Sequence, residues 1–189
     1  MDCSKLKGML NIDPDSSNFH EFPYLNKYLE RRMQSFTPAQ KKFQREMLDA
    51  HNNNRSHHCI KSLQLDDRLS RSAQDYAQRL ANLKKMVHSG TKGLGENLYM
   101  MSSSDKITNV NGSKVTGAWY DEIKEYNYTQ PSFSMKTGHF TQVVWKDSQR
   151  LGAGFAFSNG GRSLFVVAQY EPPGNFLGAF DKNVLPQKC

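Results

Sequence analysis

Four side chains have the types and local settings that metal binding or proton transfer requires: His88, Glu96, Glu122 and His139. Imidazoles bind divalent metals when neutral and accept protons near neutral pH, and carboxylates can orient an imidazole by hydrogen bonding. Glu122 is the most unusual of the four, because it falls seven residues after Val115 on a predicted helical face that is otherwise apolar. Spacing along the chain does not by itself bring the four together.

Other side chains that could do chemistry have weaker support. Ser89 and Ser102 are candidate nucleophiles, but neither lies in a Gly-x-Ser-x-Gly elbow. His51 lies on a predicted helix with an apolar face, so we interpret it as a structural hydrogen-bonding residue and not as a ligand. The remaining histidines have no comparable setting: His20, His57 and His58.

The elements that must position these residues begin at residue 37. Residues 37–40, Thr-Pro-Ala-Gln, have the pattern of a capping box with proline at the first helical position, which predicts the start of a helix. Three successive asparagines at residues 52–54 are expected to end that helix or let it fray. A second helix is predicted from Asp66 or Asp67, because the apolar residues that follow form one stripe.

The rest of the chain favours the α+β class. Residues 93–101 predict a turn that leads into a short strand, and a third helix is expected from about Lys114. Two β-type runs, residues 151–158 and 163–170, flank an Asn-Gly-Gly-Arg turn, which is a strong hairpin signal. We therefore expect a small antiparallel sheet between helices in residues 37–189, preceded by a flexible N-terminal extension over residues 1–36.

Composition limits the classes of protein that this chain can represent. Of its 189 residues 37% are hydrophobic, which is enough for one domain with a core. No apolar run approaches the roughly 20 residues of a membrane-spanning helix, and no secretory signal pattern opens the sequence. We therefore expect a cytoplasmic protein that would reach the outside of a cell only by unconventional secretion.

Charge and cysteine usage add two further expectations. Acidic and basic side chains balance over residues 1–37, so the net charge of +7 belongs to the rest of the chain. Because the chain has no nucleic-acid-binding motif, we expect the basic surface to favour anionic membranes and not nucleic acid. The cysteines, Cys3, Cys59 and Cys189, are odd in number and show no Cys-x-x-Cys spacing, so we expect no disulfide.

Several motifs carry a family resemblance. Residues 138–148, GHFTQVVWKDS, resemble in full the first signature of the CAP superfamily, which comprises cysteine-rich secretory, antigen-five and plant pathogenesis-related proteins. Residues 165–176 resemble the second signature, with Ala168 where secreted members have cysteine. Residues 51–55, 95–98 and 119–127 are similar to further family motifs, and the set is most like that of the intracellular, Golgi-associated members. The likeness covers roughly residues 38–188.

The resemblance implies an α-β-α sandwich with a cleft lined by His88, Glu96, Glu122 and His139. In such relatives the two histidines can bind zinc or another divalent cation, while the glutamates orient them. Structural zinc sites use four protein ligands and catalytic sites three, so two histidines imply a weakly held, exchangeable metal. The loop at residues 131–137 resembles the segment assigned to sterol contact, which makes Phe133 and Met135 the predicted lipid-binding side chains. Packing of this loop against the sheet is the alternative.

Three functions follow from the resemblance as expectations. The first is a non-enzymatic protein that binds a lipid (sterol, fatty acid or anionic phospholipid) and a divalent metal, attached peripherally to Golgi or other membranes. The second is a metal-dependent hydrolase or protease in which the four cleft residues are catalytic. The third is a homodimeric interaction scaffold in trafficking or autophagy.

Overall fold

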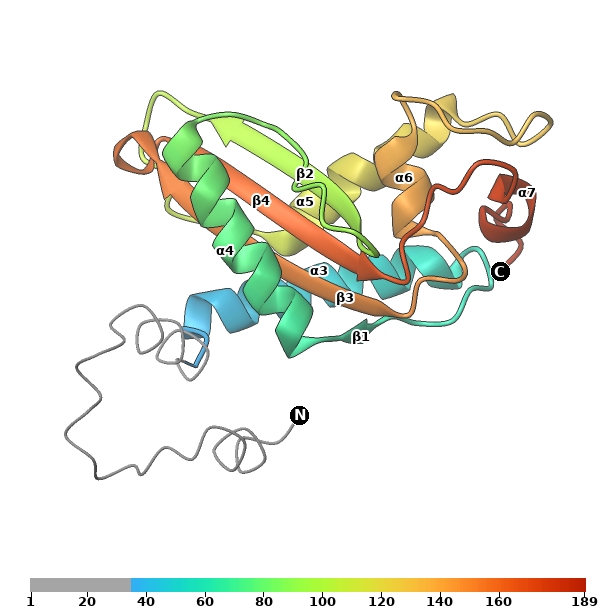
Figure 1. Cartoon of the computed structure of the whole chain (residues 1–189), viewed down its shortest axis with the longest axis horizontal. Helices are drawn as coiled ribbons and strands as arrows, with labels where there is room; N and C mark the ends of the chain where they lie inside the picture. The colour runs from blue at the N-terminus through green and yellow to red at the C-terminus, as the bar shows by residue number, and fades with distance from the viewer. Residues whose placement is uncertain (1–34) are drawn as a thin grey trace. The chain divides into compact units, whose positions relative to one another are not determined.

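The fold is known from a computed structural model that describes residues 35–189 (Figure 1). Residues Phe36–Cys189 form one compact unit. The extension predicted for residues 1–36 lies outside the described residues, apart from its last two. The elements run in this order: α3 (Pro38–Ser56), β1 (Gln64–Leu65), α4 (Asp67–Leu83), β2 (Gly95–Ser102), α5 (Gly112–Tyr120), the 3-10 segment η2 (Asp121–Glu125), α6 (Gly138–Val143), β3 (Arg150–Ser158), η3 (Asn159–Gly161), β4 (Ser163–Glu171) and α7 (Phe180–Asn183).

The four strands form one sheet in the order β1-β3-β4-β2, and helices cover both of its faces. The sheet is antiparallel except for the two-residue β1, which runs parallel to β3. Figure 1 shows α4 across the near face of β3 and β4, with α3 and α5 behind the sheet. The predicted α+β class and three-layer sandwich are therefore confirmed.

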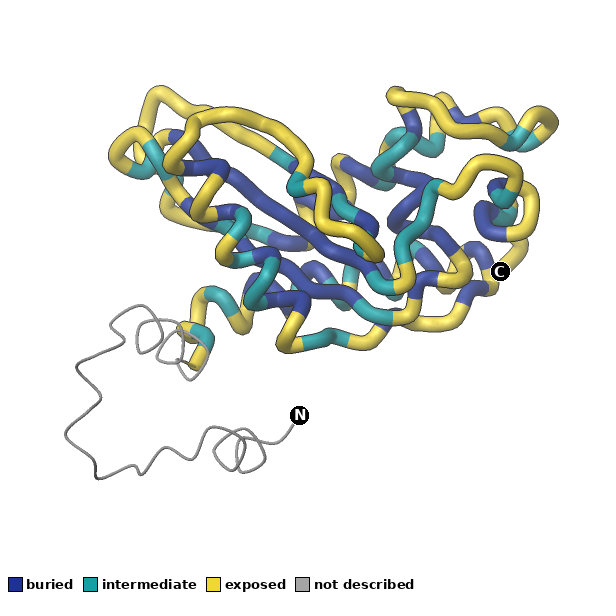
Figure 2. Tube along the Cα trace, in the orientation of Figure 1, coloured by how far each residue is buried: buried dark blue, intermediate teal, exposed yellow. Residues whose placement is uncertain are grey.

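Strand β4 is the centre of the core because both of its faces are buried, as Figure 2 shows. Alternate side chains point to opposite faces of a strand. Val166 and Tyr170 accordingly join the core beneath α3 and α5, while Phe165 and Val167 join the core beneath α4. Gly152 on neighbouring β3 lets α4 approach, since a Cβ atom there would lie 2.2 Å from the α4 backbone.

Local sequence signals set the starts of the first two helices. The capping box of α3 is present, with the Gln40 amide donating to Thr37 Oγ1 (3.2 Å) and the Thr37 amide donating to Gln40 Oε1 (2.8 Å). Asp66 caps α4 by accepting from the Leu69 amide at 2.8 Å. The predicted starts of these helices are thus confirmed.

The asparagine run does not end α3, so that prediction is wrong. The helix continues to Ser56 because the side chain of Asn52 pairs with the backbone of Leu63. Asn52 Oδ1 accepts from the Leu63 amide at 2.7 Å, and Asn52 Nδ2 donates to the Leu63 carbonyl oxygen at 3.1 Å. Arg55, one turn later, is fully buried and donates to the carbonyls of Val143 and Trp145. These distant partners hold the last turn in helical form.

The expectation of no disulfide is also wrong, because Cys59 and Cys189 are bonded with their Cα atoms 5.6 Å apart. The final residues run beside the end of α3, where the amides of Lys188 and Cys189 donate to the carbonyl oxygen of His57. Counting cysteines did not reveal this pair, since 130 residues separate its members. Within residues 35–189 no helix is both long and apolar enough to traverse a bilayer.

Candidate functional site

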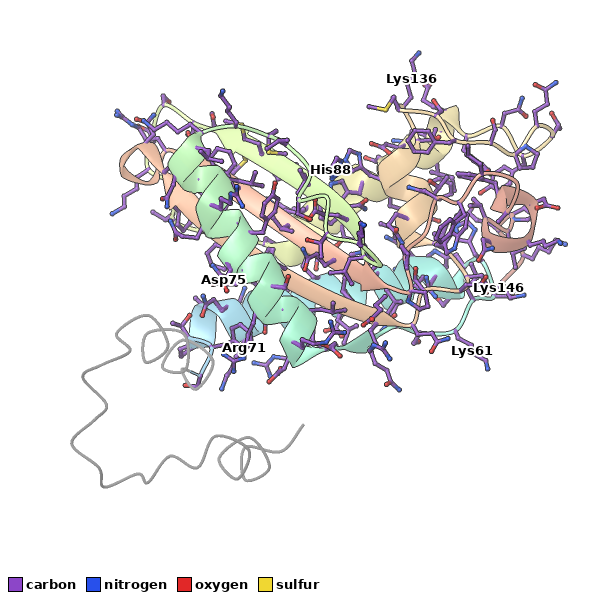
Figure 3. The ribbon with its side chains drawn as sticks, viewed as in Figure 1. Lys61, Arg71, Asp75, His88, Lys136 and Lys146 are labelled. Atoms are coloured by element: carbon purple, nitrogen blue, oxygen red, sulfur yellow. A yellow bond between two sulfur atoms is a disulfide. The ribbon has the colours of Figure 1, made fainter. Side chains whose placement is uncertain are left out.

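The first half of the candidate site pairs His88 with Glu96. His88 lies in the irregular segment before β2, and Glu96 is the second residue of that strand. Glu96 Oε1 lies 2.9 Å from His88 Nδ1 and accepts from the Ser89 amide at 2.8 Å, while its Oε2 accepts from Gln169 at 3.2 Å. Figure 3 places His88 beside β2.

Hydrogen bonding dominates the electrostatics of this pair. The hydrogen bond to Glu96 raises the pKa of His88, and partial burial opposes the rise. Burial alone would raise the pKa of Glu96, but hydrogen bonds from His88, Ser89 and Gln169 outweigh it and leave the pKa lowered. Glu96 is therefore an ionised acceptor that fixes the adjacent imidazole.

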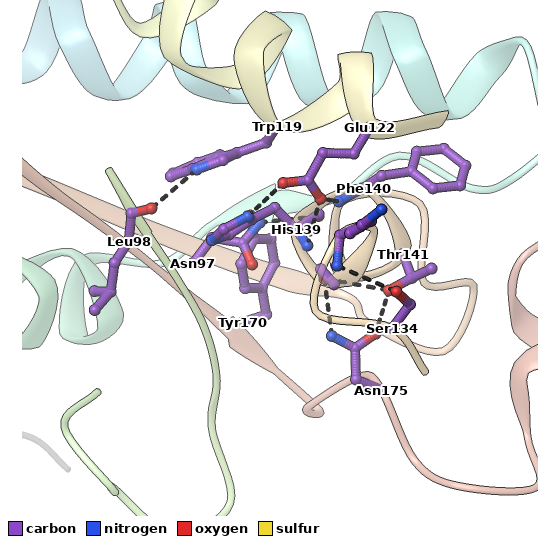
Figure 4. Close-up of polar contacts among 12 residues, drawn as sticks. Asn97, Leu98, Trp119, Glu122, Ser134, His139, Phe140, Thr141, Tyr170 and Asn175 are labelled. Atoms are coloured by element: carbon purple, nitrogen blue, oxygen red, sulfur yellow. Dashed lines mark hydrogen bonds and ion pairs between the residues drawn. The ribbon is translucent and has the colours of Figure 1, made fainter. Parts of the chain in front are cut away.

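The second half pairs His139 with Glu122 (Figure 4). Glu122 Oε1 lies 2.6 Å from His139 Nδ1, and its Oε2 accepts from the amides of His139 (3.0 Å) and Phe140 (3.1 Å). The carboxylate therefore satisfies backbone donors in the first turn of α6, where no capping side chain precedes the helix. Trp119 stacks on the imidazole, with the planes inclined by 16°.

Glu122 reaches this position by a route that the sequence did not predict. Helix α5 ends at Tyr120, and Glu122 belongs to the 3-10 segment η2. The predicted α-helix therefore stops two residues before Glu122, and a 3-10 turn continues it. Glu122 and Trp119, three residues apart, nevertheless face the same side chain, since Trp119 stacks on His139 and Glu122 bonds it.

Asn97 connects the two halves of the site. It follows Glu96 on β2, and its side-chain amide donates to the carbonyl oxygen of His139 at 3.0 Å and to the hydroxyl of Tyr170 at 3.2 Å. The four predicted residues thus form two direct pairs. The buried side-chain amide of Asn97, next to Glu96, holds the backbone of His139 (Figure 4).

The glutamate partners determine the tautomers of the two histidines. Because a carboxylate only accepts, Nδ1 of His88 and of His139 must carry a proton, so the Nε2 lone pair is available to a ligand when the imidazole is neutral. No three His, Cys, Asp or Glu side chains in residues 35–189 gather in a way that could hold a metal ion. An imidazole held by a carboxylate is a common zinc ligand in proteins. The same imidazole-carboxylate pairing also supports a general base.

Of the two candidate nucleophiles, Ser89 adjoins Glu96, and Ser102 lies at the other end of β2. Ser89 bonds Glu96 through its amide, and its hydroxyl accepts from the Thr91 amide at 3.2 Å. Ser102 lies 3.3 Å from the hydroxyl of Ser163 at the far end of β2. His51 is fully buried between Met47 O (2.7 Å) and Tyr170 Oη (2.8 Å), which confirms its structural role.

The loop at residues 131–137 leaves its apolar side chains in solvent. Met135 is 85% exposed and Phe133 is 43% exposed, so the alternative of a loop packed away against the sheet does not hold. A second exposed apolar pair, Phe176 and Leu177, was missed by the sequence reasoning, although two large apolar residues in a Gly-Asn loop could have signalled it. Asn175 joins this second loop to α6 by donating to the carbonyl of Gly138 at 2.9 Å.

The structure has the α-β-α sandwich and the two histidine–glutamate pairs that the resemblance to the CAP superfamily implies. The chain belongs to the CAP family, because the model of the cysteine-rich secretory protein family matches residues 48–170. It is 44% identical over 155 residues to Golgi-associated plant pathogenesis-related protein 1 of Homo sapiens, an alignment that covers 79% of this chain and 97% of the relative.

Further relatives agree with this assignment. Pathogenesis-related protein 1A of Nicotiana tabacum is 36% identical over 137 residues, which cover 71% of this chain and 78% of the relative. The solved structure of BmVAL-1 is similar with a TM-score of 0.65 and 26% identity, covering 83% of this chain and 87% of that one.

Proposed function

We propose that this chain is a non-enzymatic binding protein of the CAP family whose cleft takes up an exchangeable divalent cation, with zinc as the best match. Nε2 of His88 and of His139 would hold the ion. The observation that carries this proposal is the occupation of both Nδ1 atoms by glutamate oxygens, at 2.9 Å and 2.6 Å. Each imidazole is thereby oriented, and its free nitrogen becomes a better electron donor.

The number of ligands determines the expected affinity. A bound cation would supply Lewis acidity and a positive charge to the cleft. With only two protein ligands it would exchange readily, because zinc sites with three or four ligands hold the metal far more firmly. Trp119 stacked on His139 and the Asn97 bond to its carbonyl keep this ligand fixed before a metal arrives.

The test is calorimetric titration of zinc into metal-free protein at neutral pH. We expect binding at one site that is lost in the double variant His88→Ala, His139→Ala. His57→Ala is the matched control, because it removes an exposed histidine outside the cleft. Equal binding in the double variant and the wild type, or no binding in either, would sink the metal proposal.

A second function, lipid binding, is supported by a different observation. Phe133, Met135, Phe176 and Leu177 are exposed on two loops, and the Phe133 ring lies 6.5 Å from that of Phe180, which follows the second loop. Exposed apolar side chains gathered in one region mark contact surfaces for lipid or protein. The net charge of +7 and the Golgi-associated human relative support peripheral attachment to an anionic membrane, at the Golgi or elsewhere.

Lipid binding is tested with radiolabelled sterol and fatty acid and with anionic vesicles. Phe133→Ala combined with Met135→Ala is expected to lower retention of the lipid by tenfold or more, at roughly 25 cal/mol for each Å² of apolar surface that no longer contacts it. Phe157→Ala is the control, since Phe157 is comparably exposed but lies on β3. Identical retention by the loop variant and the control would refute the assignment.

A further inference from the structure

The segment that carries His88 is not fixed by burial. Residues 85–91 have no regular secondary structure and connect α4 to β2. Met86 and Val87, the two apolar residues beside His88, are exposed. Burial of apolar surface normally anchors an irregular loop, and here it contributes little. The position of His88 must therefore depend on polar contacts.

Two side chains from outside the segment provide such contacts. Glu96 binds the imidazole of His88 and the amide of Ser89 from the β2 side. From α4, the hydroxyl of Tyr76 donates to the carbonyl oxygen of Val87 at 2.6 Å. The two tethers hold consecutive residues, one holding Val87 and the other His88 with Ser89. Together they determine which way the imidazole points.

Tyr76 is well placed to act as the fixed end of its tether. It lies in the middle of α4, and its ring packs on the core cluster that includes Ala73, Ala77 and Leu80. Burial, and then the charge of Glu96, raise the pKa of the Tyr76 hydroxyl, which therefore stays protonated and able to donate. The tether thus connects the irregular segment to a rigid helix.

We propose that Tyr76 is a positioning residue for His88: by holding the Val87 carbonyl on α4, it keeps the next residue's imidazole against Glu96 with Nε2 available to a cation. The cation-binding part rests on the proposed function of the cleft. The positioning part concerns the metal-free protein and can be tested without any metal.

The test compares Tyr76→Phe, which removes only the donor oxygen, with the wild type. Loss of one such hydrogen bond is expected to speed hydrogen exchange of the Ser89 amide, which donates to Glu96, by about three- to tenfold and to weaken zinc binding by a similar factor. Tyr99→Phe is the matched control, because Tyr99 is a partly buried tyrosine that packs on the opposite core cluster. In this control, and at His139 in both variants, exchange should match the wild type.

The outcomes separate the two proposals. Unchanged exchange of the Ser89 amide in Tyr76→Phe overturns the positioning role, whether or not zinc binds. Faster exchange that is equally large throughout α4 and β2 also overturns it, because the hydroxyl would then be supporting the core. If the wild type binds no zinc but exchange rises only at residues 86–91, the positioning role stands and the cation proposal fails.

Discussion

Replacing His51 with glutamine should change how the stability of the protein depends on pH. His51 is fully buried on α3, with Nδ1 bonded to the Met47 carbonyl and Nε2 to the Tyr170 hydroxyl. Burial lowers the pKa of His51 from 6.5 to about 4. The unfolded chain binds a proton near the ordinary value, so the folded state takes up that proton far less readily.

The magnitude follows from proton linkage. Between pH 6.5 and about 4 the unfolded state binds more protons than the folded state, so the free energy of unfolding falls as the pH falls. Above that window His51 is neutral in both states and no stability is lost. At 1.36 kcal/mol for each pKa unit the complete effect is about 3 kcal/mol, of which about 2.5 kcal/mol falls between about pH 7.5 and about pH 4.5.

The assay is urea unfolding followed by the fluorescence of the buried tryptophans, for wild type and His51→Gln across this pH range. The variant starts less stable, and its deficit should shrink by about 2.5 kcal/mol at the acidic end, because glutamine does not titrate. The difference in unfolding free energy between wild type and variant removes the contributions of the carboxylates and of His58, which are the same in both proteins. His58 needs this correction because burial lowers its pKa as well. A deficit that stays constant with pH would falsify the assignment of a neutral, buried His51.

Three further changes test the packing of the fold. Arg55→Ala removes the donors to four backbone carbonyls and should cost about 3–5 kcal/mol in urea unfolding, and a loss under about 1 kcal/mol would contradict this role. Gly152→Ala should abolish soluble expression because its Cβ would meet the α4 backbone at 2.2 Å, whereas Gly117→Ala, with nothing within 4 Å, should be tolerated. Reduction of the disulfide should lower the free energy of unfolding by about 2–4 kcal/mol, and Cys59→Ser should make stability insensitive to reductant.

The features that sequence predicted well depend on contacts within a few residues. The start of α3 needs only Thr37 and Gln40, three positions apart, and the start of α4 needs only Asp66 and Leu69. The turn between β3 and β4 likewise depends on Asn159 and the two glycines that follow it, which adopt positive φ values. Such signals are legible because both partners fall inside one short window of sequence.

The features that sequence missed depend on distant partners. The last turn of α3 persists because Arg55 donates to the carbonyls of Val143 and Trp145, which lie 88 and 90 positions further along the chain. The disulfide likewise joins cysteines 130 positions apart. At the candidate site the residue types were identified in advance, but their pairing was not. Glu122 could be matched with His139 only after the 3-10 turn of η2 and the backbone amides of α6 were located.

A series of hydrogen bonds connects His51 through Tyr170 and Asn97 to His139, and the donor in each bond can be assigned. Because the Met47 carbonyl can only accept, His51 Nδ1 carries the proton and Nε2 accepts from the Tyr170 hydroxyl. The hydroxyl oxygen of Tyr170 then accepts from Asn97, whose amide also holds the carbonyl of His139. A protonated His51 would make Nε2 a donor to the Tyr170 oxygen and would leave the Tyr170 hydroxyl hydrogen without this acceptor. Neutral His51 is thus the state in which the Tyr170 hydrogen has an acceptor while the Tyr170 oxygen accepts from Asn97.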